Sequence, residues 1–222
     1  MKEKTIVINN TPFTYMDEVG DEYAFKAMTQ TDLIEMLDLT ASLLKECGID
    51  FVLAFGTLLG AVREGNVIKG DEDIDIIVMD ENKLYNSLPY LSEHGLFINR
   101  IYKTELYEFH TEERKGYLDM YIMRPIDKLL YKNRCVSIRG HYAPKRFFEG
   151  VDPDNYRIDG KSYPCPSHPE NLLEWWYGKT WRIPQSKKAV EDVLIRRMWL
   201  FPSKICRKVN KRIKRWFKKG NR

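Results

Sequence analysis

The sequence predicts an α+β protein in which helices pack on a sheet of short strands. Residues 31–47 carry apolar side chains at helical spacing, which predicts an amphipathic helix. Short apolar runs at 51–55 and 73–79 predict two buried strands, and further strand candidates follow between residues 97 and 123. With 43% hydrophobic and 31% charged residues, the chain can bury a core and is not a disordered segment.

Capping residues set the expected ends of the first helices. Thr31 is the expected N-cap of the first helix, and Gly48 stands where a C-terminal glycine belongs. Pro89 lies inside a helical segment over 81–93, so we expect a break or a late start there, because proline cannot donate a backbone hydrogen bond.

A turn separates the first two strands. Gly56 and Thr57 are expected to turn the chain into a short helix over 58–63. Residues 1–28 are expected to form an irregular or short-stranded lead-in.

The amino-acid composition changes in the second half of the chain. Six prolines and little periodicity over 124–170 predict loops and short strands wrapped on the core. The remaining expected elements are strands at 97–102, 105–110 and 117–123 and helices at 170–178, 187–199 and 203–219. We therefore divide the chain into a main domain over 1–185, with a loop-rich C-terminal part, and a helical tail over 186–222.

Charge is distributed unevenly along the chain. Ten of the 36 basic residues lie in 204–222, which has no acidic residue, so the rest of the chain has 26 basic and 32 acidic residues. Apolar residues fall on one face of this segment, which is typical of a basic amphipathic helix on an anionic membrane surface. A helix docked on the acidic body is the alternative. No nucleic-acid partner is expected, because no stacking platform or base-reading motif accompanies the charge.

Cysteine usage and the N-terminus indicate the compartment. The four cysteines form no CxxC pair, which favours reduced thiols over a disulfide framework or a zinc site. No apolar stretch is long enough for a signal peptide or a membrane span. We expect a cytoplasmic protein, peripheral on the inner face of the plasma membrane if the basic helix binds there.

Carboxylates cluster at the start of the second strand. Side chains two apart in a strand point to the same face, so Asp73 and Asp75 aim at one spot, with Asp71 just before them. Like charges held together need a cation, and Mg²⁺ is the one usually bound by one or two carboxylates plus substrate phosphates. Asp119 adds a third carboxylate as the lone charge in a later apolar strand. A solvated acidic turn is the alternative.

A phosphate site is expected beside these carboxylates. The backbone N–H groups of a helix that begins after Gly56 and Thr57 can bind phosphate, and the Thr57 hydroxyl can add a hydrogen bond. Arg63 can contact phosphate oxygens in a bidentate manner. The candidates for substrate binding are therefore Gly56, Thr57, Arg63 and Asp71.

Three segments carry a family resemblance. GTLLGAVREGNVIKGDEDIDI, GYLDMYIM and HPENLLEWWYGKTWRIP resemble the LicD/fukutin-related phosphotransferases of the nucleotidyltransferase-fold superfamily. The resemblance implies a mixed sheet flanked by helices, with Mg²⁺ (Mn²⁺ as an alternative) held by Asp73, Asp75 and Asp119. One position departs from the family pattern, since Lys69 and Gly70 stand where Pro-Trp is common.

The resemblance also implies an activity. Members of this family move a substituted phosphate from a nucleotide-activated donor, such as a CDP-alcohol, to a hydroxyl of a cell-surface glycan. Phosphocholine, polyol phosphate and phosphosugar are the groups implied, in lipopolysaccharide or teichoic acid biosynthesis, with an acceptor that is lipid-linked in some cases. Two alternatives stay open. One is a nucleotidyltransferase acting on a small molecule, protein or RNA, and the other is a non-catalytic binding protein with the same fold.

Overall fold

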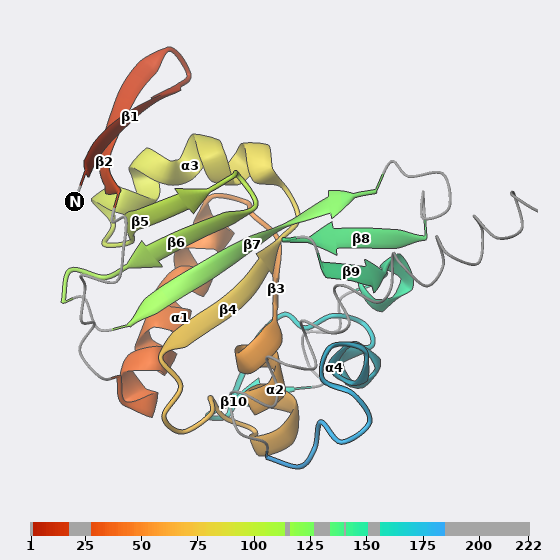
Figure 1. Ribbon diagram of the computed structural model, residues 1–222. Coiled ribbons are helices and arrows are strands. Elements are labelled where there is room, and N and C mark those ends of the chain that lie inside the picture. Colours follow the sequence, from red (N-terminus) through yellow and green to blue (C-terminus); the bar gives the residue numbers. More distant parts are fainter. Residues whose placement is uncertain are drawn as a thin grey trace, which may run out of the picture. The chain divides into compact units, whose positions relative to one another are not determined.

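A computed structural model describes residues 2–17, 28–113, 116–126, 134–139, 141–150 and 156–184 (Figure 1). The chain divides into two compact units, Met1–Leu173 and Glu174–Arg222. Among the described residues, no helix combines the length and the apolar character needed to cross a membrane. The helices expected at 187–199 and 203–219, and the domain boundary expected at 185, lie outside the described residues.

A mixed sheet forms the centre of the first unit. Its main strands lie in the order β3-β4-β7-β6-β5, where β4 and β7 are parallel and the other neighbours are antiparallel. The hairpin β8–β9 extends the sheet from the end of β7. The bounds are β3 Phe51–Leu53, β4 Asp73–Val78, β5 Phe97–Tyr102, β6 Leu106–His110, β7 Tyr117–Pro125, β8 Cys135–Ile138 and β9 His141–Pro144. The predicted α+β class and mixed sheet are confirmed.

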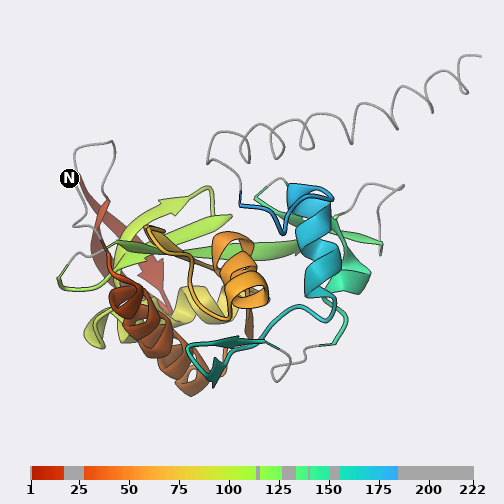
Figure 2. The same cartoon turned by 90° about the horizontal axis from the view of Figure 1, so that it is seen from below.

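Helices lie on both faces of this sheet. Helices α1 (Gln30–Glu46) and α3 (Glu81–Glu93) cover one face (Figure 2). Helix α2 (Phe55–Glu64) begins beside the other face, where its first turn is hydrogen-bonded to Asp75. The alternation of β4 explains the division, since Ile74 and Ile76 point to one face and are fully buried, whereas Asp73 and Asp75 point to the other. The face that carries α2 is therefore the polar face of the sheet.

Helix α1 begins earlier than expected. Its N-cap is Thr29, so the prediction of Thr31 was wrong. The Thr29 hydroxyl accepts a hydrogen bond from the Asp32 N–H at 3.2 Å, and the Asp32 carboxylate accepts from the Thr29 N–H at 2.8 Å. This reciprocal capping box needs a side-chain acceptor three positions after the cap, and Ile34 cannot supply one to Thr31. The end of α1 is as predicted, with Gly48 at a φ of 63°.

Helix α2 begins three residues earlier than the helix predicted over 58–63. The helix starts at Phe55, so Gly56 and Thr57 belong to its first turn and do not precede it. Phe55 has a φ of 34°, in the left-handed region that large side chains rarely adopt. This residue redirects the chain from β3 into α2, and the strain falls immediately before the two residues predicted to contact phosphate.

Helix α3 is continuous through Pro89, so the predicted break is absent. Leu84, Leu88 and Leu91 are fully buried along one face of the helix. Their packing on the sheet compensates for the hydrogen bond that proline cannot donate.

Short elements complete the described chain. The lead-in is a hairpin, and the segment over 124–170 contains short strands and turns, as predicted. Gly178 follows the last described helix at a φ of 91°, as expected for a helix-ending glycine. The bounds are β1 Lys2–Ile8, β2 Thr11–Asp17, η1 (a 3₁₀ helix) Lys145–Phe147, β10 Arg157–Ile158, β11 Lys161–Ser162 and α4 Pro169–Tyr177.

Candidate active site

Three carboxylates meet where β4 and β7 run side by side. The parallel register sets Asp75 opposite Asp119, and alternation sets Asp73 on the same face. One oxygen from each of Asp73, Asp75 and Asp119 can be chosen so that all three lie within 4.8 Å of one another. The side chains that the sequence singled out are thus brought together on the polar face of the sheet.

The start of α2 holds Asp75 in place. The Gly56 N–H donates to Asp75 Oδ2 at 2.9 Å, and the Asp75 N–H donates to the Thr57 hydroxyl oxygen at 2.8 Å. The Ala54 N–H donates to the Asp75 carbonyl at 3.0 Å. Both the carboxylate and the backbone of Asp75 are therefore fixed by the first turn of α2 and by its N-cap residue, Ala54.

Gly56 is also the point where Asp71 approaches the cluster. A Cβ at this position would lie 2.9 Å from Asp71 Oδ2 and 3.3 Å from Asp75 Oδ2. A side chain here would displace the Asp71 carboxylate, so glycine leaves the room in which the two carboxylates meet. Asp71, expected near the substrate, lies beside the same turn.

Burial and mutual repulsion raise the pKa of the central carboxyls. Burial is the main cause of the raised pKa of Asp75, and the charges of Asp73 and Asp119 add to it, while the Gly56 N–H opposes it. Burial also raises the pKa of Asp119 to about 7, with a further contribution from Glu108, against the effects of the Tyr121 hydroxyl and two arginines. A bound cation would relieve both shifts.

Asp119 has an oxygen left for a ligand. Its Oδ2 accepts a hydrogen bond from the Tyr121 hydroxyl at 2.9 Å. Its Oδ1 is buried and has no hydrogen-bond partner among the described residues, although the side chain is only 5% exposed. A buried oxygen of this kind is costly unless an ion or a substrate group meets it. The all-oxygen donor set fits a hard divalent cation such as Mg²⁺ or Mn²⁺.

Glu108 is a further buried carboxylate beside Asp119 that the sequence did not single out. It lies on β6 directly opposite Asp119 and is 6% exposed. Arg100 donates to its Oε2 at 2.7 Å, and the Asn99 amide donates to its Oε1. Glu108 therefore has its own partners and acts on Asp119 through charge. Its position in LYEFH, a strand without strict alternation, gave no signal of this contact.

Arg63 is not joined to the carboxylate cluster by any contact between described residues. It lies in the last turn of α2, about 10 Å along the helix axis from Gly56 at 1.5 Å per residue. Its guanidinium instead pairs with Glu64, where Nε donates to Oε1 at 2.9 Å. The turn between β8 and β9 brings a different arginine, Arg139, to the site, and no motif in the sequence marked it.

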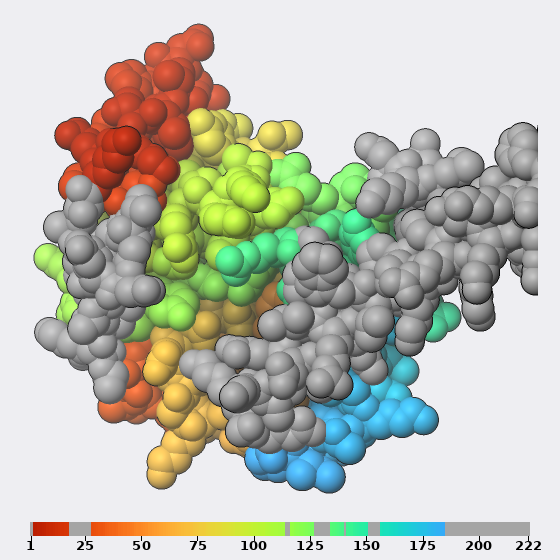
Figure 3. Space-filling view, viewed as in Figure 1, coloured from red at the N-terminus to blue at the C-terminus, as the bar shows by residue number. Residues whose placement is uncertain are grey.

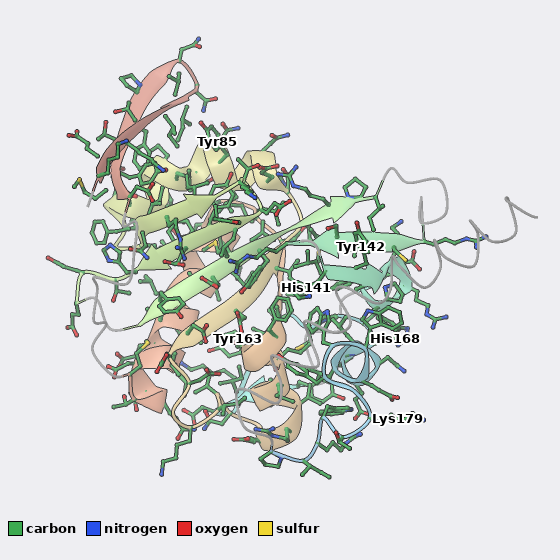
Figure 4. All side chains as sticks on the ribbon, in the orientation of Figure 1. Tyr85, His141, Tyr142, Tyr163, His168 and Lys179 are labelled. Carbon is green, nitrogen blue, oxygen red and sulfur yellow. The ribbon has the colours of Figure 1, made fainter. Side chains whose placement is uncertain are left out.

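Aromatic rings line the site beyond Asp119. The Phe55 ring packs edge-on against Tyr121, with centroids 4.9 Å apart, and lies 5.9 Å from the His141 ring. Figure 4 labels His141 at the start of β9. Burial and the nearby charge of Arg139 lower the pKa of His141, so its imidazole is neutral at physiological pH. The β8–β9 hairpin thus contacts the first residue of α2.

We predict that the Thr57 hydroxyl is needed for stability. Replacing Thr57 with Val keeps the volume but leaves the buried Asp75 N–H without a partner. The free energy of unfolding should fall by about 1–3 kcal/mol, measured by urea denaturation. Thr57→Ser keeps the oxygen and is the matched control, so its loss should be smaller. Equal losses in the two variants would contradict this role.

A second prediction concerns pH and divalent ions. In the unfolded chain these carboxyls titrate near an ordinary pKa of about 4, whereas folded Asp119 holds its proton up to about pH 7. Between these values the folded state binds more protons than the unfolded state. The metal-free protein should therefore lose stability as pH rises through this interval.

Thermal melts near pH 5.5 and pH 8, with EDTA or with Mg²⁺, test this dependence. At about 100 times its Kd the ion should stabilise the protein by about 2.7 kcal/mol at the higher pH and by much less at the lower pH, where protons compete. Asp119→Asn should remove much of the pH dependence. An ion response that is the same at both pH values would refute the carboxylate site.

Curated relatives match only part of this chain. Uncharacterized protein RP689 of Rickettsia prowazekii (strain Madrid E) is 29% identical over 138 residues, which cover 61% of this chain and 48% of the relative. Uncharacterized protein RT0683 of Rickettsia typhi (strain ATCC VR-144 / Wilmington) is 29% identical over 136 residues, which cover 57% and 44%. The chain therefore spans about half the length of the curated relatives it matches.

Solved structures of an antibiotic adenylyltransferase and of an antibiotic-resistance factor are also similar. The lincosamide antibiotic adenylyltransferase LnuA, lincomycin-bound, has a TM-score of 0.48 and 18% identity over 76% of this chain and 96% of that chain. The antibiotic-resistance factor ANT(2'')-Ia has a TM-score of 0.47 and 14% identity over 84% and 100%. The same protein in complex with adenylyl-2''-tobramycin has a TM-score of 0.45 and 15% identity over 84% and 99%.

A family profile covers the whole acidic site. The profile described as LicD/FKTN/FKRP, nucleotidyltransferase domain, matches residues 48–168, more than half of the 222 residues. The match includes β4, β6 and β7 with all of the carboxylates described above, and it supports a transferase. The resemblance expected from the sequence motifs is confirmed, and the chain belongs to the LicD/FKTN/FKRP family.

Proposed function

We propose that the protein is a Mg²⁺-dependent phosphotransferase of the LicD type, with Mn²⁺ as an alternative ion. It moves a substituted phosphate from a nucleotide-activated donor, most simply a CDP-alcohol, to a hydroxyl of a cell-surface glycan. The observation that carries the proposal is the convergence of Asp73, Asp75 and Asp119 beside the first turn of α2. Family membership supports the same class of reaction.

The three aspartates would hold the ion. Bound there, a divalent cation would offset the charge on the donor phosphates and on the leaving nucleoside monophosphate. Asp75 is pre-positioned for this by the Gly56 N–H and by the Thr57 oxygen that fixes its backbone. No reorganisation of these groups is then needed when the donor arrives, which lowers the barrier to reaction.

Asp119 is the residue best placed to act on the acceptor. The acceptor oxygen forms its bond to phosphorus while the donor's P–O bond to the leaving nucleotide breaks, and the hydroxyl proton must be accepted. The buried Oδ1 of Asp119, which lacks a described partner, can orient the hydroxyl or take this proton. The Tyr121 hydroxyl donates a hydrogen bond to the other oxygen, Oδ2, and this bond fixes the orientation of the carboxylate.

A nucleotidyltransferase acting on a small molecule, protein or RNA is the second candidate. The matched profile itself describes a nucleotidyltransferase domain, which favours keeping it. The two reactions differ in the bond that breaks. A phosphotransferase using a CDP-alcohol releases CMP, whereas a nucleotidyltransferase using a nucleoside triphosphate releases pyrophosphate.

Product analysis with variants tests both candidates. The protein is incubated with Mg²⁺ and a panel of CDP-alcohols, nucleotide sugars and nucleoside triphosphates, and released CMP, other nucleoside monophosphates and pyrophosphate are measured. Asp73→Asn and Asp75→Asn should each reduce turnover by about a hundredfold or more. Glu72→Gln is the matched control, because Glu72 is an exposed carboxylate directly before Asp73 that does not belong to the three-carboxylate cluster. An active Asp73→Asn, Asp75→Asn double variant would refute the proposal.

Residues 204–222, which lie outside the described part of the chain, are proposed to bind an anionic membrane surface at the inner face of the plasma membrane. Ten basic residues with no acidic one would each gain about 1 kcal/mol or less near anionic lipid, which would bring the site to a lipid-linked acceptor. In liposome flotation, the full chain should float with anionic vesicles and not with neutral ones, and a 1–203 form should float with neither. Equal flotation of both forms would rule out this anchor.

A further inference from the structure

The turn between β8 and β9 places an arginine in an unfavourable backbone conformation. Ile138 pairs with His141, so Arg139 is the first residue of a two-residue hairpin turn. Its φ is 47°, in the left-handed region, where such turns favour asparagine, aspartate or glycine. The sequence thus carries a long charged side chain where a shorter one would fit the backbone better, and such strain is often found at functional sites.

The register of the sheet locates this arginine. Its guanidinium lies over the Tyr102 ring, 5.3 Å from the centroid. Tyr102 opposes Leu106, and Leu106 opposes Tyr121, so these three side chains form one row across the polar face. In Figure 3 the colours of the β8–β9 and β5–β6 segments meet on this face.

The carboxylates form the next row of the same face. Arg100 opposes Glu108, Glu108 opposes Asp119, and Asp119 opposes Asp75. The two rows are two residues apart along each strand, which is about 7 Å. The hairpin also contacts the opposite side of the site, because the ring of His141, the first residue of β9, approaches Phe55 at the start of α2. Arg139 therefore stands at the edge of the carboxylate cluster.

The charge of Arg139 is available to a ligand. Its positive charge lowers the pKa of Asp119 and of Tyr121, against the effect of burial. Two other arginines of this unit are already paired, Arg100 with Glu108 and Arg63 with Glu64. Arg139 makes no ion pair or hydrogen bond with any other residue in the part of the chain that the structure describes.

We propose that Arg139 is a substrate-binding residue that contacts the phosphates of the nucleotide-activated donor from the side opposite α2. The inference rests on the proposed function. The site gathers Asp71, Asp73, Asp75 and Asp119, so one divalent ion leaves an excess of negative charge before the donor phosphates add theirs. A guanidinium meets phosphate oxygens in a bidentate manner, and the Tyr102 ring beneath it restricts its motion.

Nucleotide binding to the full-length chain tests this role. Titration calorimetry with CDP in the presence of Mn²⁺ should give an affinity about ten- to a hundredfold lower for Arg139→Gln than for the wild type. Arg139→Lys should recover part of the loss in affinity, because lysine keeps the positive charge but lacks the paired donors of the guanidinium. Arg134→Gln is the matched control, since Arg134 is an exposed arginine at the other end of the same hairpin, and its affinity should be unchanged.

Arg139→Asn separates substrate binding from a structural role. Asparagine tolerates the left-handed conformation, so this variant should melt at the same temperature as the wild type or higher, while it binds CDP about tenfold more weakly or worse. A residue that served only the fold would show a lower melting temperature and unchanged CDP affinity. Mn²⁺ binding without nucleotide, followed by electron paramagnetic resonance, should persist in this variant, because Arg139 is not a metal ligand.

The outcomes distinguish this inference from the function on which it rests. If the wild type binds CDP and both Arg139→Gln and Arg139→Asn bind it equally well, the role of Arg139 is refuted and the proposed function stands. If the wild type binds neither CDP nor ADP with Mn²⁺ or Mg²⁺, the nucleotide-dependent function fails, and this inference fails with it.

Discussion

The parallel pairing of β4 with β7 is the constraint on which the rest of the site depends. It places Asp75 and Asp119 side by side on a buried part of the polar face, where like charges repel and water cannot screen them. The Gly56 N–H and the Tyr121 hydroxyl each donate to one of these carboxylates, and the charge of Arg139 acts on Asp119. These contacts reduce the repulsion but do not remove it, since the pKa of both carboxyls remains raised. An added cation would stabilise the ionised form of this arrangement, and cation binding would then be coupled to the stability of the fold.

The first turn of α2 holds Asp75 in place. The sequence predicted a turn whose N–H groups and hydroxyl would contact phosphate. In the structure, the Gly56 N–H and the Thr57 oxygen are both engaged by Asp75. The strained Phe55 makes this possible, because it lets the helix begin directly over β4. The local cost is offset by fixing a carboxylate that would otherwise be free to turn away from its neighbours.

Local patterns were sufficient to find the carboxylates but not their neighbours. The two-residue spacing in DIDIIV predicted that Asp73 and Asp75 share a face, and an isolated charge in YLDMYI marked Asp119. The N-cap of α1 and the continuity of α3 were harder to predict. Thr29 is the N-cap because of its reciprocal hydrogen bonds with Asp32, and α3 continues through Pro89 because its apolar face packs on the sheet. Glu108 and Arg139 could not be found at all. Their proximity to Asp119 is set by strand register and by a hairpin turn, and neither is encoded in a short window of sequence.

The hydrogen bonds of α2 limit the positive charge that this helix could offer to the phosphates of a nucleotide-activated donor. Because the Gly56 N–H donates to Asp75, the first turn of α2 has fewer free N–H groups than a helix whose N-terminus has no such acceptor. Arg63, at the far end of the same helix, pairs with Glu64. A donor with two phosphates would therefore meet too little positive charge from α2 and one metal ion alone. Arg139 in the β8–β9 turn would supply this charge from the opposite side and would place the phosphates between two fixed groups. Such an arrangement would favour in-line displacement, because the donor would be held at both ends while the acceptor approached Asp119.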